Sequence, residues 1–207
     1  MAAKIADGLG MKVPEAMPKA LVKSLPPEVL KSPALSLTAL PGDGGIRSRK
    51  VAILVADGVE GASIVAVQAA LTTAGAVACV IAPRLGPVQT ADGESLVATA
   101  TLENSPSVLF DALVLPDGND GVGLLAGYGQ TQEFVTNQYR HGKTILALGA
   151  SQVLLDQAGI SIILASGKPD PGILLAGGDM LGDGVAAFIV AAGKHRHPAR
   201  DTEPPQF

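Results

Sequence analysis

Hydrophobic residues follow two alternating patterns over residues 50–195. Short runs that are apolar almost throughout are typical of parallel strands buried on both faces, and they occur at 51–56, 76–83, 111–118, 144–149 and 172–176. Stretches with apolar residues at helical spacing lie between or after them, at 61–74, 130–140, 150–158 and 182–195. The stretch 84–101 contains Gly86, Pro87 and the turn sequence DGE, which together predict a β-hairpin.

This alternation of strands and helices predicts the fold class. Strands separated by helices of this length imply βαβ units and a parallel sheet. We therefore expect an α/β, flavodoxin-like doubly wound fold, with a mainly parallel sheet and helices on both faces. In such folds the ligand crevice lies at the carboxyl ends of the strands.

The first 49 residues differ from the rest of the chain. The opening MAAKIADGLGM predicts a short helix ended by Gly8 or Gly10. Six prolines between Pro14 and Pro41 then favour extended structure over a packed domain. We expect a proline-rich linker or arm at 1–49, a domain at 50–198 and a flexible tail at 199–207.

Composition excludes several classes of protein. The net charge is −4 and only 3% of residues are aromatic, so neither a nucleic-acid partner nor an anionic membrane surface is expected. Cys79 is the only cysteine, which excludes an internal disulfide framework and a cysteine-built zinc site. A reducing cytoplasm is compatible with this and is our expected localisation. No apolar run reaches the length of a transmembrane helix.

Candidate acids follow the first strand, in the turn ADGVEG. Asp57 and Glu60 would lie at the carboxyl end of that strand, where they could act in acid–base chemistry or orient a nucleophile. Carboxylates are also common at helix starts, where they cap the helix and favour its dipole. We favour this structural interpretation.

The stretch ILALGASQVLLDQAGI, residues 145–160, predicts a buried strand, a tight turn and a helix. Enzymes often place a nucleophile at such a turn, but here the turn is Gly149, Ala150 and Ser151. Glycine has no side chain, and Ser151 is more plausibly a helix-cap or first-turn residue. The turn after LVLPDG, at 113–118, offers backbone N–H groups for an oxyanion, but no nucleophile opposes it.

The remaining reactive residues give no catalytic set. Cys79 lies inside an apolar strand, where a thiol is usually inert. His141 is expected in a solvated loop, and His195 and His197 lie near the end of the last helix, two residues apart and thus on different faces. A nucleophile–histidine–acid triad is hard to assemble, and no metal or cofactor site is expected.

The segments KVAILVADGVEGASI, FDALVLPDG and GKTILALGASQVLLDQAGI resemble the ThiJ/PfpI superfamily, relatives of class I glutamine amidotransferases. The resemblance places the family's elbow cysteine at Gly149, its histidine at Ala150 and its acidic partner near Glu60. Both elbow groups are therefore absent. This removes the protease, deglycase and amidotransferase chemistry that the resemblance would otherwise imply.

A resemblance to the end of the large-subunit haem catalases covers almost the whole chain. It is carried by the order AKIADGLGMKVPEAMP, a proline-rich linker, SPALSL and RKVAILVADGV, together with VLPDGND and GKTILALG. The family's haem-binding β-barrel and its distal and proximal motifs are missing. The resemblance implies that haem and hydrogen peroxide dismutation belong to the full-length protein and not to this chain.

Three hypotheses follow. The first is a non-catalytic accessory domain, partnered by the catalase core, that stabilises the homotetramer and shapes access to the haem channel. The second is a chaperone-like holding activity of the isolated domain on unfolded client proteins. The third is a residual hydrolase or deglycase that uses Ser151, Asp57 or Glu60, which no nearby base supports.

Overall fold

The structure is a computed structural model that describes residues 2–17 and 44–202, in two units, Met1–Pro41 and Gly42–Phe207. The described part of the first unit contains helix α1 (Ala2–Gly8), as predicted, and a turn in which Gly10 has a φ of 65°. Most of the predicted proline-rich linker falls in 18–43, which lies outside the described residues.

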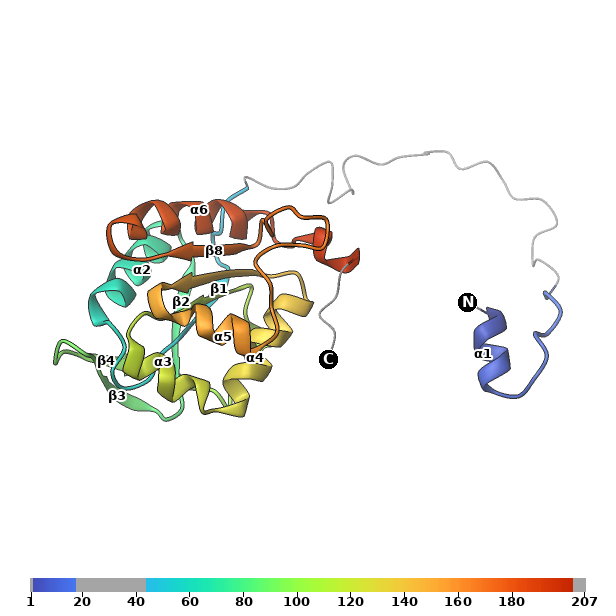
Figure 1. Ribbon diagram of the computed structural model, residues 1–207, viewed down its shortest axis with the longest axis horizontal. Helices are drawn as coiled ribbons and strands as arrows, with labels where there is room; N and C mark the ends of the chain where they lie inside the picture. Colours follow the sequence, from blue (N-terminus) through green and yellow to red (C-terminus); the bar gives the residue numbers. More distant parts are fainter. Residues whose placement is uncertain (1, 18–43, 203–207) are drawn as a thin grey trace. The chain divides into compact units, whose positions relative to one another are not determined.

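The second unit is built on a six-stranded parallel sheet in the order β5-β2-β1-β6-β7-β8 (Figure 1). The strands are β1 (Lys50–Leu54), β2 (Val77–Ala82), β5 (Ala100–Thr101), β6 (Ala112–Leu115), β7 (Thr144–Leu148) and β8 (Ile173–Ala176). Without the short edge strand β5, this is the flavodoxin-like order 2-1-3-4-5. The predicted fold class is confirmed.

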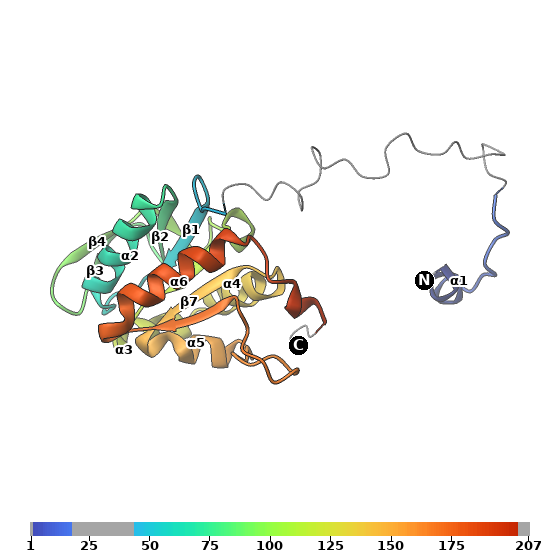
Figure 2. The ribbon, with the colours of Figure 1, turned by 90° about the horizontal axis from the view of Figure 1, so that it is seen from above.

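Helices cover both faces of this sheet (Figures 1 and 2). They are α2 (Gly61–Thr73) and α6 (Leu181–Gly193) on one face, and α3 (Asn119–Ala126), α4 (Gly129–Arg140) and α5 (Gln152–Gln157) on the other. Successive residues of a strand point to opposite faces, so β1 contributes Ile53 to a core shared with α2 and α6 and Leu54 to a core shared with α3, α4 and α5. The core therefore has two layers, one on each side of the sheet.

Helix α2 shows how the sequence sets an element's limits. Its Ile64, Val67 and Leu71 recur at helical spacing and are fully buried. The helix ends where Gly75 adopts a φ of 80°, which favours glycine. There the Ala76 N–H donates to the carbonyl of Leu71 and the Gly75 N–H to that of Thr72, a Schellman motif.

The predicted hairpin is present as β3 (Gly86–Gln89) and β4 (Ser95–Ala98), paired antiparallel. Its Val88 and Leu96 join the core layer under α2 and α6. Helix α3 and strand β5 were not predicted. Helix α3 carries Gly121 and Gly123 within eight residues, which lowers its intrinsic helix propensity, and β5 has only two residues.

The limits of the packed unit differ from those predicted at both ends. Ile46 is 1% exposed and belongs to the core, so packing begins before Lys50. At the other end, the tail was predicted to begin at residue 199, and the structure has a 3-10 turn over Pro198–Thr202. There Arg200 forms a buried two-point ion pair with Asp170 and lies 4.5 Å from the ring centre of Tyr139. Residues 203–207 lie outside the described part of the chain.

Candidate functional site

The strand–turn–helix at 145–160 forms the predicted elbow at the carboxyl edge of the sheet. Strand β7 ends at Leu148, a 3-10 turn covers Gly149–Ser151, and helix α5 follows directly. Gly149 has a φ of 44°, a backbone conformation that side chains other than glycine rarely adopt. A strained turn of this kind presents a nucleophile in several enzyme classes, so the backbone shape of such a site is present.

The place where a nucleophile would project is taken by the carboxylate of Asp117. A Cβ atom built on Gly149 would overlap both carboxylate oxygens of Asp117. The same carboxylate accepts hydrogen bonds from the Ala150 N–H, at 2.9 Å, and from its own neighbour Gly118 N–H, at 2.7 Å. The backbone donor that follows the elbow residue would suit an oxyanion. Here this N–H is already hydrogen-bonded to the Asp117 carboxylate.

Sheet register explains why Asp117 reaches this position. Strands β6 and β7 are parallel neighbours, with Leu115 opposite Ala147. The residues two positions later, Asp117 and Gly149, therefore leave the sheet side by side. Sequence analysis treated the turn after β6 only as a source of N–H groups and missed the Asp117 side chain, because the pairing of β6 with β7 joins residues far apart in the sequence.

Close backbone packing holds the turn after β6 in place. Gly118 has a φ of 104°, and a Cβ there would lie 2.7 Å from the carbonyl oxygen of Gly58. The Glu60 N–H donates to the Asp117 carbonyl at 2.9 Å. The turns after β1 and β6 are thus held against each other, and they fix the Asp117 carboxylate over Gly149.

The sequence-predicted acids separate into two places. Glu60 lies at the start of α2 and lines a cavity of about 140 Å³ together with Asp117, Leu148 and Gly177. Glu60 makes no side-chain capping bond, so the expected helix-cap role is not seen. Asp57 instead accepts a hydrogen bond from the Gln89 N–H, at 2.8 Å, and holds the hairpin.

Ser151 is fully buried, and its hydroxyl donates to the Leu148 carbonyl at 2.8 Å. It makes no side-chain capping bond to α5. The hydroxyl closes the turn behind Gly149 and does not face the cavity that Glu60 and Asp117 line. The cavity itself is small beside the 300–1,000 Å³ or so of typical ligand pockets. Its polar walls are two carboxylates and Ser63, whose hydroxyl donates to the Glu60 carbonyl.

The histidines lie away from the elbow. His141 and His195 are exposed. His197 is 2% exposed, and its Nε2 lies 2.9 Å from the hydroxyl of Thr144, at the opposite end of β7 from the elbow. Burial, reinforced by the charges of Arg200 and Lys194, lowers the pKa of the His197 imidazole. His197 is therefore a buried ring whose environment favours the neutral form.

Two further findings bear on the kind of site. Among the described residues, no cluster of three or more histidine, cysteine or carboxylate side chains could hold a metal ion. Searching the same residues for a helix long and apolar enough to cross a membrane finds none. Cys79, expected as inert core, is half-buried on β2.

Comparison with known proteins gives a family. Residues 47–202 match the model of the C-terminal domain found in long catalases. "Catalase HPII" of Pseudomonas putida is 34% identical over 95% of this chain and 25% of its own length. "Catalase C" of Rhizobium meliloti is 35% identical over 79% of this chain and 23% of its own length. The chain thus spans about a quarter of the length of these relatives.

Solved structures give the same fold at lower identity. A ThiJ/PfpI domain protein of Brachyspira murdochii has a TM-score of 0.61 at 17% identity, with 70% of this chain and 96% of that chain covered. A two-domain protein of Anabaena variabilis, containing DJ-1/ThiJ/PfpI-like and ferritin-like domains, has a TM-score of 0.63 at 20% identity. There the match covers 70% of this chain and 50% of that chain. At these identities the likeness concerns the fold alone, and it agrees with the predicted ThiJ/PfpI-like architecture.

Proposed function

Because the chain belongs to the family of C-terminal domains found in long catalases, we propose that it is a non-catalytic accessory domain of such an enzyme. In this role it packs on the catalase core, stabilises the homotetramer and shapes access to the haem channel. The parent reaction, hydrogen peroxide dismutation, takes place in the part of the enzyme outside this domain. Residues 1–49 are the arm that leads from that part.

The observation that carries the proposal is the Asp117 carboxylate over Gly149. A catalytic elbow needs a side chain that can attack and a free donor for the developing oxyanion. Here the first is absent, its space is filled, and the Ala150 N–H is bound to Asp117. With Ser151 turned inward on Leu148, a residual hydrolase has no group placed to act.

Haem does not fit the buried histidine of this domain. Axial haem ligands are commonly histidine, cysteine, methionine or tyrosine side chains facing a pocket. The His197 Nε2 is already at hydrogen-bond distance from Thr144. We therefore assign haem to the catalase core. We place the protein in the cytoplasm, in line with its single cysteine.

A deletion in the complete enzyme tests the proposal. Removing residues 44–202 should change peroxide turnover per haem only through altered access to the haem channel and should not abolish it, because the domain contributes no reacting group. It should lower the temperature at which the tetramer dissociates, measured by native mass determination during heating. Complete loss of turnover per haem in a tetramer that stays intact and keeps its haem would overturn the proposal.

A holding activity on unfolded clients is the second candidate. The feature that favours it is the outer surface of α2, where Val65 is 54% exposed. Suppression of citrate synthase aggregation by the isolated chain is the assay, and no suppression at equal molar amounts dismisses it.

A further inference from the structure

The outer surface of helix α2 has no charged residue. Its inward positions are buried in the core, while the outward positions Ala62, Val65, Ala66 and Ala69 are exposed. A surface helix of a globular protein normally carries charged or polar residues opposite its apolar stripe, and a helix that is apolar all round is normally covered. Gln68 is half-buried, and the exposed polar residues Thr72 and Thr73 lie in the last turn. The composition of 62–69 is therefore that of a helix surface that is covered.

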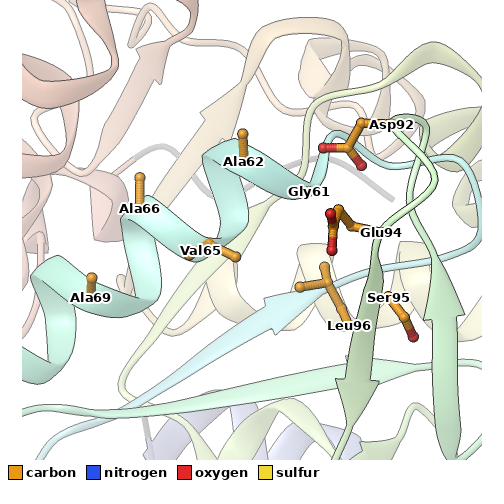
Figure 3. A pocket seen from close by; sticks show the side chains of 9 residues that line it. All are labelled: Gly61, Ala62, Val65, Ala66, Ala69, Asp92, Glu94, Ser95 and Leu96. Carbon is orange, nitrogen blue, oxygen red and sulfur yellow. The ribbon is translucent and has the colours of Figure 1, made fainter.

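A groove runs along this exposed side of α2 (Figure 3). Its volume is about 490 Å³, and its other wall is the turn and second strand of the β3–β4 hairpin, including Ser95 and Leu96. Alanines at 62, 66 and 69 leave the groove open because their side chains are short. The space is within the range of volumes that admit a ligand or several bulky side chains.

Two carboxylates, Asp92 and Glu94, lie at the end of the groove near the start of α2 (Figure 3). The Thr90 hydroxyl donates to Asp92 and lowers the pKa of that carboxyl, so it is ionised at neutral pH. Within residues 44–202, the ion pair found is Arg200–Asp170, and neither Asp92 nor Glu94 has a cationic partner. The groove therefore carries two uncompensated negative charges.

The lining of the groove supplies no cation to balance this charge. Asp92 and Glu94 are the only charged residues among those that line it. If two copies of the domain associated through this groove, the carboxylates of one copy would face those of the other, and neither copy would supply a cation. Charge complementarity thus favours a basic partner over a second copy.

We propose that the groove between α2 and the β3–β4 hairpin is the docking surface for a basic, aliphatic segment of the catalase core. An aliphatic side chain of that segment enters the groove beside Ala66 and Leu96, and a neighbouring lysine or arginine pairs with Asp92 and Glu94. The identity of the partner rests on the proposed function, while the apolar and acidic character of the groove does not.

Photo-crosslinking in the complete, assembled enzyme identifies the occupant. A photoreactive amino acid replaces Val65, and the control replaces Val153, which is 44% exposed on α5 on the other face of the sheet. The expected product joins position 65 to a core peptide that contains aliphatic residues and a lysine or arginine, and position 153 gives no such product. A product with a second copy of this domain, a product with residues 18–43, or no product from position 65 would overturn the inference.

Charge variants measure the contribution of the groove to binding. Val65→Glu is expected to weaken the binding of the isolated chain to a catalase core lacking this domain by about tenfold or more. Glu94→Lys is expected to weaken this binding by a few fold, and the effect should be smaller at high salt. The matched controls, Val153→Glu and Glu103→Lys, should stay within about twofold, with folding of all variants checked by urea denaturation.

Two failures remain distinguishable in this experiment. If the wild-type chain does not bind the core at all, the proposed function fails, and the inference fails with it. If the wild-type chain binds and both groove variants bind as tightly, the docking surface alone is wrong.

Discussion

Replacing Gly149 with alanine should destabilise the domain, although the change adds one methyl group at a position with no catalytic side chain. The new Cβ would overlap the Asp117 carboxylate. Asp117 must then leave, and it loses the hydrogen bonds from the Gly118 and Ala150 N–H groups. The backbone must also hold alanine at a φ of 44°.

The magnitude follows from these two contributions. Holding a non-glycine residue in the left-handed region costs about 1–2 kcal/mol. Hydrogen bonds to charged groups are worth about 1.5–3 kcal/mol each when buried. The three residues that form these bonds, Asp117, Gly118 and Ala150, are half-buried. Water can therefore replace part of each lost hydrogen bond, and we take a cost of about 1 kcal/mol for each bond. Gly149→Ala should therefore lower the free energy of unfolding by about 3–4 kcal/mol.

A double-mutant cycle separates the two contributions. In an Asp117→Ala background the overlap is gone, so Gly149→Ala should cost only the backbone contribution, about 1–2 kcal/mol. The free energies are measured by urea denaturation of the four proteins, with the slope m required to stay constant. If Gly149→Ala costs the same with and without Asp117, the carboxylate does not occupy the elbow and the reasoning is refuted.

Two further predictions concern the buried C-terminal contacts. Burial, with the charge of Arg200 next in effect, holds the pKa of His197 below its usual 6.5, so the unfolded chain binds this proton more readily and the free energy of unfolding should fall as pH drops below about 6.5. Urea titrations at several pH values should show this slope reduced in His197→Gln, and an unchanged slope would contradict it. Arg200→Met leaves the buried Asp170 carboxylate without its partner and should cost about 3–5 kcal/mol. Adding Asp170→Asn should recover much of that loss, and equal stability of wild type and Arg200→Met in thermal unfolding would show that the pair contributes nothing.

Local patterns in the sequence were enough to predict the sheet and most of the helices. Strands such as 51–54 and 144–148 are continuous apolar runs because both faces of the sheet are covered. The elbow was also predictable, since a strand, a small-residue turn and a helix follow one another directly in 145–160. The sequence also shows directly that the elbow position holds a glycine, which has no side chain that could act as a nucleophile.

Features that depend on distant residues could not be predicted in this way. Asp117 occupies the elbow because of a pairing between two strands, and its own neighbours indicate only a turn. Arg200 lies in a polar stretch that is typical of a solvated tail. In the structure it is buried and forms an ion pair with the carboxylate of Asp170, 30 residues earlier. Ile46 is a lone apolar residue among glycines and charges, and only the assembled core shows that it is buried.

The carboxylate at the elbow also affects how this turn could regain reactivity. A single Gly149→Cys substitution would put its Cβ in the space of the Asp117 carboxylate, which would have to move aside but is still attached next to the new thiol. Negative charge beside a thiol opposes its ionisation, and the thiolate is the nucleophile. The backbone would also have to hold a side chain at a φ of 44°. Chemistry at this position is therefore at least two coordinated substitutions away, and any redesign of the elbow has to begin at residue 117.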